Sequence, residues 1–113
     1  MRLEAKKYLH DIARSAGLTL QFVAGKAYLD YVSDPLLRSA VERQMQTVGE
    51  ALAQLAKIDP DTAARITEHQ KIIAFRNILV HGYANIDDRV VWSLLELKLP
   101  QLSREAEALL AEG

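Results

Sequence analysis

The feature that most constrains this chain is a run of apolar residues at helical spacing that follows an Asp-Pro pair. Asp34 can cap a helix N-terminus, and Pro35 suits the first helical position. Apolar side chains then recur every three or four residues, which is typical of an amphipathic helix, at Leu36, Leu37, Ala40, Val41, Met45, Val48, Leu52 and Leu55. The pattern predicts a long helix from Pro35 to Lys57.

Most of the remaining chain shows the same helical spacing. Gly17 weakens the first of these patterns, Asp59-Pro60 repeats the start signal, and Pro100 kinks or restarts the last helix. Strand-like alternation never extends beyond a few residues. We therefore expect an all-α fold, a bundle of four to five helices with short loops, with further helices over residues 3–24, 71–81, 87–97 and 100–110.

Length and composition narrow the class of protein. The 113 residues suit one domain, which we expect to cover 1–113. The net charge of −1 lacks the strong positive field of proteins that coat nucleic acid, and the absence of cysteine excludes disulfide frameworks, zinc fingers and thiol nucleophiles. Neither a membrane span nor a secretory signal is visible, so we expect a cytoplasmic protein.

The segment from Lys71 to Val80 departs from the amphipathic pattern. Its apolar groups cover most of a helix circumference, which predicts a helix in the middle of its assembly. Arg76 and Asn77 nevertheless lie in the centre of this run. A buried guanidinium needs a carboxylate, a phosphate or a wet cleft. The run stops at His81-Gly82, where Gly82 is expected to take a left-handed conformation just past the helix.

Spacing alone leaves the role of these residues open. In an unbroken helix, Arg76 and His81 would lie about 140° apart and about 7.5 Å along the axis. A helix that ends at Gly82 would let the imidazole turn toward Arg76, so that both could line one cleft with Tyr83. The structural alternatives are an ion pair of Arg76 with Glu50, a capping role for His81 and an ordinary surface position for Tyr83.

The stretch Arg76-Asn77-Ile78-Leu79-Val80-His81-Gly82-Tyr83 resembles a known signature. An arginine, four residues, a histidine, any residue and a tyrosine mark the HEPN ribonucleases. Within that superfamily the chain is similar to the HepT-like toxins, whose partners are MntA-type nucleotidyltransferase antitoxins. The resemblance extends to Ile86-Asp87, Val91-Trp92, Arg43 and Gly49-Glu50-Ala51. Residues 67–74 lack the proline and tryptophan often found in the family.

The resemblance implies a HEPN-type bundle that forms a symmetric homodimer and cleaves RNA without a metal or another cofactor. It implies that Arg76 and His81 are catalytic and that Asn77 and Tyr83 contact the substrate. Tyr83 is also implied as the acceptor of AMP that the antitoxin adds. An imidazole exchanges protons near neutral pH and a guanidinium can grip a phosphate, so both side chains suit this chemistry.

Other functions remain as alternatives. One is a catalytically silent HEPN subunit that binds nucleotide or substrate for a nucleotidyltransferase complex, and another is a plain dimerisation bundle. The three histidines lack the spacing of a two-histidine metal site, and glycine-rich phosphate loops are absent. Trp92 is interpreted as a core residue rather than a base-stacking platform. The presence of Arg76, His81 and Tyr83 together favours an enzyme.

Overall fold

The computed structural model describes residues 1–82 and 86–113. The helices in chain order are α1 (Leu3–Val23), α2 (Tyr28–Val32), α3 (Pro35–Ile58), α4 (Pro60–Ala64), α5 (His69–His81), α6 (Asp88–Leu97) and α7 (Leu99–Glu112). The described residues contain helices and connecting segments but no strand, which confirms the all-α prediction. Five longer helices match the predicted ones, and the additional α2 and α4 contain five residues each.

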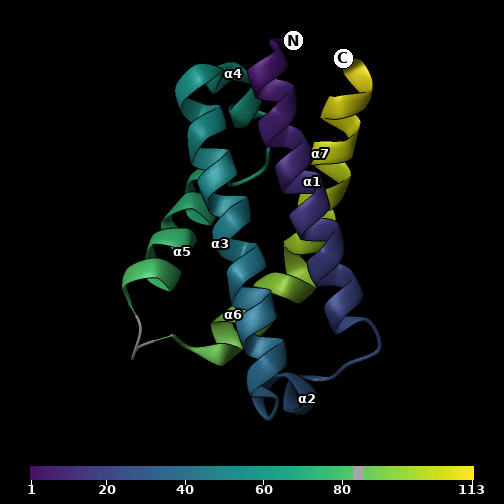
Figure 1. Cartoon of the computed structure of the whole chain (residues 1–113), viewed down its shortest axis with the longest axis vertical. Helices are drawn as coiled ribbons and strands as arrows, with labels where there is room; N and C mark the ends of the chain where they lie inside the picture. Colours follow the sequence, from purple (N-terminus) through teal and green to yellow (C-terminus); the bar gives the residue numbers. More distant parts are fainter. Residues whose placement is uncertain (83–85) are drawn as a thin grey trace.

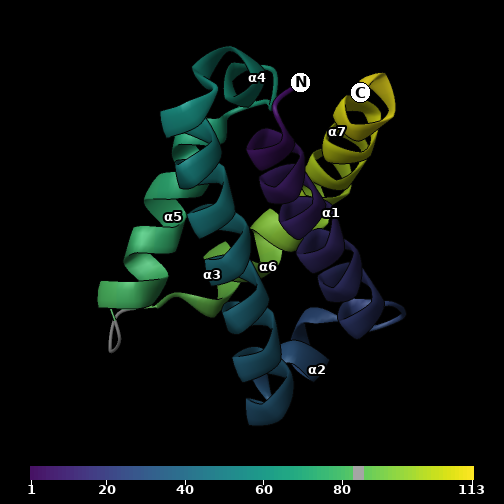
Figure 2. The same ribbon diagram turned by 45° about the horizontal axis from the view of Figure 1, so that its top comes forward.

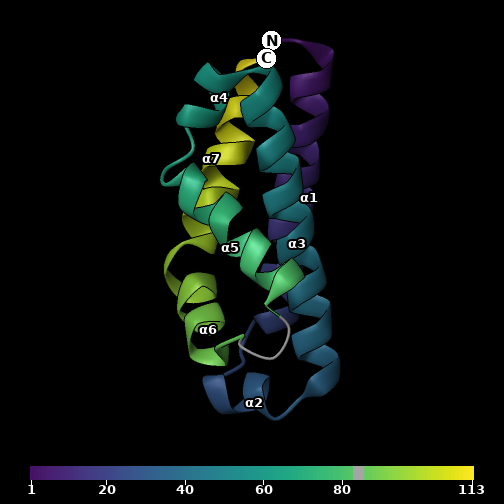
Figure 3. The ribbon, with the colours of Figure 1, turned by 90° about the vertical axis from the view of Figure 1, so that its left-hand side faces the viewer.

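The long helices run side by side along the molecule (Figure 1). Helix α1 packs between α3 and α7, while α5 packs on the other side of α3. Both termini and α4 lie at one end of the bundle, and α2 lies at the opposite end (Figure 2). Helix α6 contacts α7 and α2. One face of the molecule therefore carries α5, α6 and part of α7 (Figure 3).

The core lies where the apolar faces of α1, α3 and α7 meet. Complete burial of a leucine side chain stabilises the fold by about 2 kcal/mol, and α3 contributes several such residues because its apolar stripe faces both α1 and α5. The residues of this core with no exposed surface include Leu9, Ile12, Val41, Val48, Leu52, Leu55 and Leu99. Trp92 is partly buried and packs against the core, with its ring centroid 5.4 Å from that of Tyr31. Its interpretation as a core residue rather than a base-stacking platform stays a prediction.

Local capping explains where several helices begin. The Oδ1 of Asp34 accepts hydrogen bonds from the backbone N–H groups of Leu36 and Leu37, each at 3.1 Å. Asp87 rather than Asp88 caps α6, because its Oδ1 accepts from the N–H of Arg89. Helix α7 restarts at Leu99 with Pro100 in its first turn, and α1 continues through Gly17.

Some apolar residues in the predicted stripes lie outside the core. Leu3, Leu36 and Leu97 are 84%, 80% and 70% exposed. None of the helices in the described ranges is long and apolar enough to cross a membrane. The cytoplasmic location and the single domain over 1–113 stay predictions.

Candidate active site

Helix α5 presents most of the motif along the edge of the bundle. Ile72, Phe75 and Leu79 recur at helical spacing and form its buried face. Ile78 is 53% exposed, so the predicted placement of this helix in the middle of the assembly is wrong for the single chain. The helix packs against α3 along one side and leaves Ile78 at the surface.

Arg76 packs directly against Gly49 of α3. A Cβ atom built on Gly49 would lie 2.2 Å from the Cβ of Arg76 and 2.7 Å from its Cγ. The Nε of Arg76 is buried and has no hydrogen-bond partner among the described residues, whereas its Nη1 donates to the Oδ1 of Asn77 at 2.9 Å. The Cβ and Cγ of Arg76 therefore lie close against α3. The hydrogen bond to Asn77 links the orientation of the Arg76 guanidinium to the Asn77 side chain.

The structural alternative of an ion pair between Arg76 and Glu50 is not realised. Within residues 1–82 and 86–113, no carboxylate forms an ion pair with Arg76. Glu50 lines a polar groove between α1 and α3 together with Tyr8 and Arg43. The guanidinium thus keeps its positive charge without an acidic partner in this part of the chain.

His81 is the last residue of α5 and is exposed. Its ring forms no hydrogen bond or ion pair with any residue that the structure describes. The side chain is therefore accessible to a ligand or to a second protein chain.

Gly82 differs from the prediction. Its φ of −100° is not left-handed, and its N–H donates to the carbonyl of Ile78 at 2.7 Å. A Cβ at this position would lie 2.7 Å from the same carbonyl oxygen, so close packing explains the glycine better than left-handed geometry. Helix α5 ends at His81 with Gly82 as its C-cap, as predicted, and no contact between the His81 ring and Arg76 is present among the described residues.

The two implied catalytic side chains consequently leave α5 in different directions. Five residues of α-helix turn by about 140° and advance by about 7.5 Å. The structure brings Arg76 together with Asn77, and it records no contact between Arg76 and His81. Tyr83 lies outside the described residues, so the predicted cleft of Arg76, His81 and Tyr83 stays a prediction.

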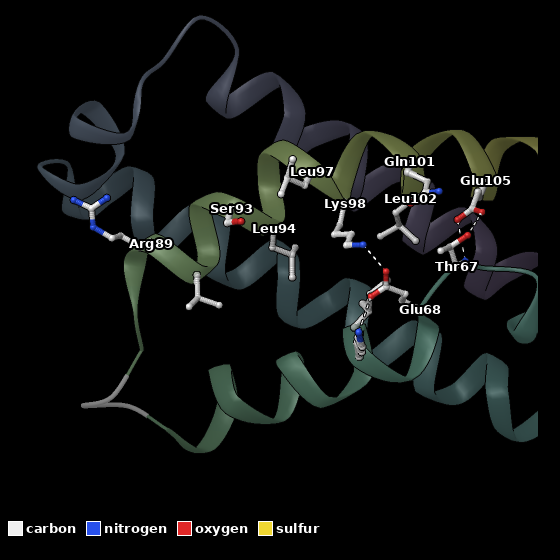
Figure 4. Close-up of a pocket in the computed structure, with 13 residues that line it drawn as sticks. Thr67, Glu68, Arg89, Ser93, Leu94, Leu97, Lys98, Gln101, Leu102 and Glu105 are labelled. Atoms are coloured by element: carbon white, nitrogen blue, oxygen red, sulfur yellow. Dashed lines mark hydrogen bonds and ion pairs between the residues drawn. The ribbon is translucent and has the colours of Figure 1, made fainter.

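A separate groove with a volume of 390 Å³ lies between α5, α6 and α7 (Figure 4). Leu94, Leu97 and Leu102 contribute apolar surface, and charged residues lie along its edge. Glu68 interacts there with Lys98 and with Lys71, whose Nζ is 3.2 Å from the Glu68 carboxylate. These interactions hold the pKa of Glu68 below its ordinary value. Arg76 and His81 do not line this groove.

A second electrostatic cluster lies near the start of α6. Burial, followed by the negative charge of Asp88, raises the pKa of Glu42, while Arg38 opposes this shift. Burial also raises the pKa of Tyr31 well above its ordinary value. The Tyr31 hydroxyl is buried without a partner in the described part of the chain.

The described residues contain no group of three or more His, Asp or Glu side chains that could hold a metal ion. This finding leaves open whether the reaction needs a metal, and the metal-independent route stays a prediction. Sequence reasoning identified the positions of Arg76 and His81 but not the contact between Arg76 and Gly49. Only the tertiary packing of α5 on α3 shows that contact. The family resemblance had included Gly49-Glu50-Ala51, but it did not indicate that Gly49 packs against Arg76.

Comparison with known proteins assigns the family. The family model described as "Ribonuclease HepT-like" matches residues 12–109. The chain belongs to the HepT-like ribonuclease family. The predicted resemblance to HepT-like HEPN proteins and the prediction of a ribonuclease are therefore confirmed at this level.

Individual relatives cover nearly the whole chain. "Probable ribonuclease HepT" of Thermococcus cleftensis is 29% identical over 112 residues, which span 96% of this chain and 98% of the relative. "Putative RNase TTE0752" of Caldanaerobacter subterraneus subsp. tengcongensis is 26% identical over 105 residues, or 93% of each chain. "Putative RNase MJ1380" of Methanocaldococcus jannaschii is 26% identical over 92% of this chain and 94% of its own length. No solved structure shows significant similarity.

Proposed function

We propose that this HepT-like chain is a metal-independent endoribonuclease toxin that acts as a symmetric homodimer. Arg76 and His81 are its catalytic residues, and Asn77 and Tyr83 contact the RNA. An MntA-type nucleotidyltransferase antitoxin neutralises it by adding AMP to Tyr83. The observation that supports this function most strongly is that one helix, α5, carries an accessible imidazole and a guanidinium without a carboxylate partner among the described residues.

The proposed reaction uses the RNA's own nucleophile. The 2′-oxygen attacks the adjacent phosphorus, and the bond from phosphorus to the 5′-oxygen breaks. A base takes the proton of the 2′-hydroxyl, and an acid gives a proton to the departing 5′-oxygen. His81 performs proton transfer, and Arg76 stabilises the extra negative charge on the phosphorane. The products are a 2′,3′-cyclic phosphate and a 5′-hydroxyl.

A dimer supports this chemistry in two ways. One chain offers a single motif histidine, whereas a shared cleft would supply one imidazole as base and another as acid. Arg76 and His81 also leave α5 about 140° apart, so a second chain offers a way to combine an arginine and a histidine at one phosphate. The exposed Ile78 lies between them in the sequence and gives that region apolar surface.

RNA cleavage with defined product ends tests this function. We expect purified protein to cut RNA in the presence of EDTA and to leave a 2′,3′-cyclic phosphate. A substrate with a single 2′-deoxy nucleotide at the cleavage site should resist cutting there. His10→Ala is the matched histidine control, because His10 is an exposed residue on α1. Cleavage that requires added metal, or that proceeds at the 2′-deoxy position, would contradict the proposed chemistry.

Control by AMP addition has a separate test. A bulky anion on Tyr83 would compete with RNA phosphate for the motif. Co-expression with an MntA-type nucleotidyltransferase and ATP should increase the mass of the chain by whole AMP units, and Tyr83→Phe should abolish this increase. An unmodified Tyr83 in fully neutralised protein would refute this mode of control.

A further inference from the structure

Helices α3 and α5 approach each other closely at Gly49 and Arg76. Gly49 is buried in α3, and a Cβ atom there would lie 2.2 Å and 2.7 Å from the Cβ and Cγ of Arg76. Contacts below 3.0 Å are essentially never made by real Cβ atoms. Any side chain at position 49 would therefore displace Arg76 or separate the two helices.

Gly17 shows that the need for a glycine at position 49 does not apply to every glycine inside a helix. It also lies inside a long helix, but a Cβ at Gly17 would meet no atom within 4 Å from the other described parts of the chain beyond its sequence neighbours and its own helix backbone. A glycine in a helix interior usually destabilises a protein relative to alanine. Position 17 follows that expectation, whereas at position 49 the space is filled by the arginine side chain.

One edge of the Arg76 guanidinium is closed to a ligand. The Nε of Arg76 is buried without a partner in the described structure, so a ligand cannot use the edge that contains it. The two Nη atoms remain, and Nη1 is bonded to the Oδ1 of Asn77. The Cβ and Cγ of Arg76 thus pack against Gly49 on α3, and its guanidinium is bonded to Asn77 on α5.

We propose that Gly49 is a positioning residue for Arg76, because its missing side chain lets α3 hold the arginine with Nε enclosed and only the Nη edge presented to a phosphate. The role in cleavage rests on the proposed function, whereas the contact itself does not. Gly49 touches neither the substrate nor the reacting atoms. It acts only through the place and orientation of the arginine.

The first test compares Gly49→Ala with Gly17→Ala in RNA cleavage. A displacement of a catalytic group by about 1 Å can cost about 100-fold in rate. We expect Gly49→Ala to lower kcat by about that factor with a smaller effect on KM, and Gly17→Ala to match the wild type. In the Arg76→Gly background, which removes the Cβ and Cγ that the new side chain would meet, Gly49→Ala should cause little further loss. Additive losses would show a general structural role and overturn the proposal.

The second test does not depend on catalysis. The enclosed Nε–H of Arg76 should exchange slowly with water and give a resolved ¹H–¹⁵N signal near neutral pH, which Arg76→Lys identifies by its disappearance. Gly49→Ala should remove or strongly shift this signal, and Gly17→Ala should leave it unchanged. An unchanged signal in Gly49→Ala would overturn the proposal. If Arg76→Ala cleaves RNA normally, the proposed function fails while this signal still tests the contact.

A folding failure of Gly49→Ala is also informative. The double variant with Arg76→Gly removes both side-chain atoms that the new Cβ would meet, and leaves the Arg76 Cα at an ordinary 3.5 Å. We expect circular dichroism to show that the double variant regains helical structure and a cooperative thermal transition. A double variant that stays unfolded would show that the arginine side chain is not what requires the glycine.

Discussion

Arg76 keeps its positive charge available because its hydrogen-bond partner is an amide rather than a carboxylate. The bond from Nη1 to the Oδ1 of Asn77 orients the guanidinium but does not neutralise it. An ion pair with Glu50 would have placed a negative charge where a phosphate is proposed to bind. The Arg76 guanidinium is therefore held in one orientation, while its positive charge stays available to bind a phosphate.

Asn77 provides a sharp test of this arrangement. Asn77→Ala removes the bond and should lower RNA cleavage moderately, by about tenfold, because the guanidinium loses one constraint. Asn77→Asp should lower it further, because the new carboxylate would pair with Arg76 and compete with the phosphate. Steady-state kinetics and RNA affinity at fixed salt measure both variants. An Asn77→Asp enzyme as active as Asn77→Ala would contradict this account.

Glu42 gives a prediction about pH and stability. Its pKa is raised above the ordinary 4.5, so the fold disfavours its ionised form. The contribution of this group to stability is present below pH 4.5 and is lost as the pH rises through the raised pKa. Glu42→Gln should therefore raise the Tm at pH 7 by about 2 °C and have little effect at the acidic limit.

Differential scanning calorimetry across this pH range measures the effect. The control is Glu107→Gln on the exposed side of α7, which should change the Tm less at pH 7. A lower Tm for Glu42→Gln at pH 7 would mean that attraction to Arg38 outweighs burial and the repulsion from Asp88.

At the scale of the elements, helix starts were predictable because their causes are local. Asp34 and Asp87 are each followed within two or three residues by the N–H groups that they cap, so the sequence contains the whole interaction. The end of α5 at His81 was also predicted, but the conformation of Gly82 was not, because the glycine is required by close approach to the Ile78 carbonyl. The Gly49 contact joins residues 27 positions apart and becomes visible only when α5 packs on α3.

The cap of α3 is testable at the same scale. Asp34→Ala removes an acceptor for two backbone N–H groups and should cost about 1 kcal/mol of unfolding free energy. Asp34→Asn should retain most of the stability, because an asparagine oxygen caps almost as well. Urea denaturation followed by circular dichroism compares the variants. Equal stability of Asp34→Ala and wild type would show that this cap contributes little.

At the scale of the whole molecule, the bundle leaves its motif helix at an edge. The helix expected in the middle of the assembly packs against α3 and exposes Ile78. Amphipathic spacing identifies which residues form a helix, but it does not state which other helix, or which second chain, covers each side. The all-α class was therefore predictable from the sequence, whereas the placement of α5 was not.

Dependence on concentration tests the proposed homodimer. Sedimentation velocity should show a species of twice the chain mass, and specific RNA cleavage should fall when dilution populates the monomer. Ile78→Asp should promote dissociation and reduce cleavage together, because it places a charge in the proposed contact region. Leu36→Asp is the control, because it changes another exposed apolar residue, at the start of α3. A fully active monomer would contradict the shared cleft.

The most direct measurement is the single-turnover rate of RNA cleavage by wild type, Arg76→Ala and His81→Ala in EDTA, with thermal melting to confirm that each variant is folded. The account predicts rate losses of at least about 100-fold for each of the two substitutions and none for His10→Ala. Wild-type rates in either folded variant would contradict the claim that Arg76 and His81 cleave RNA.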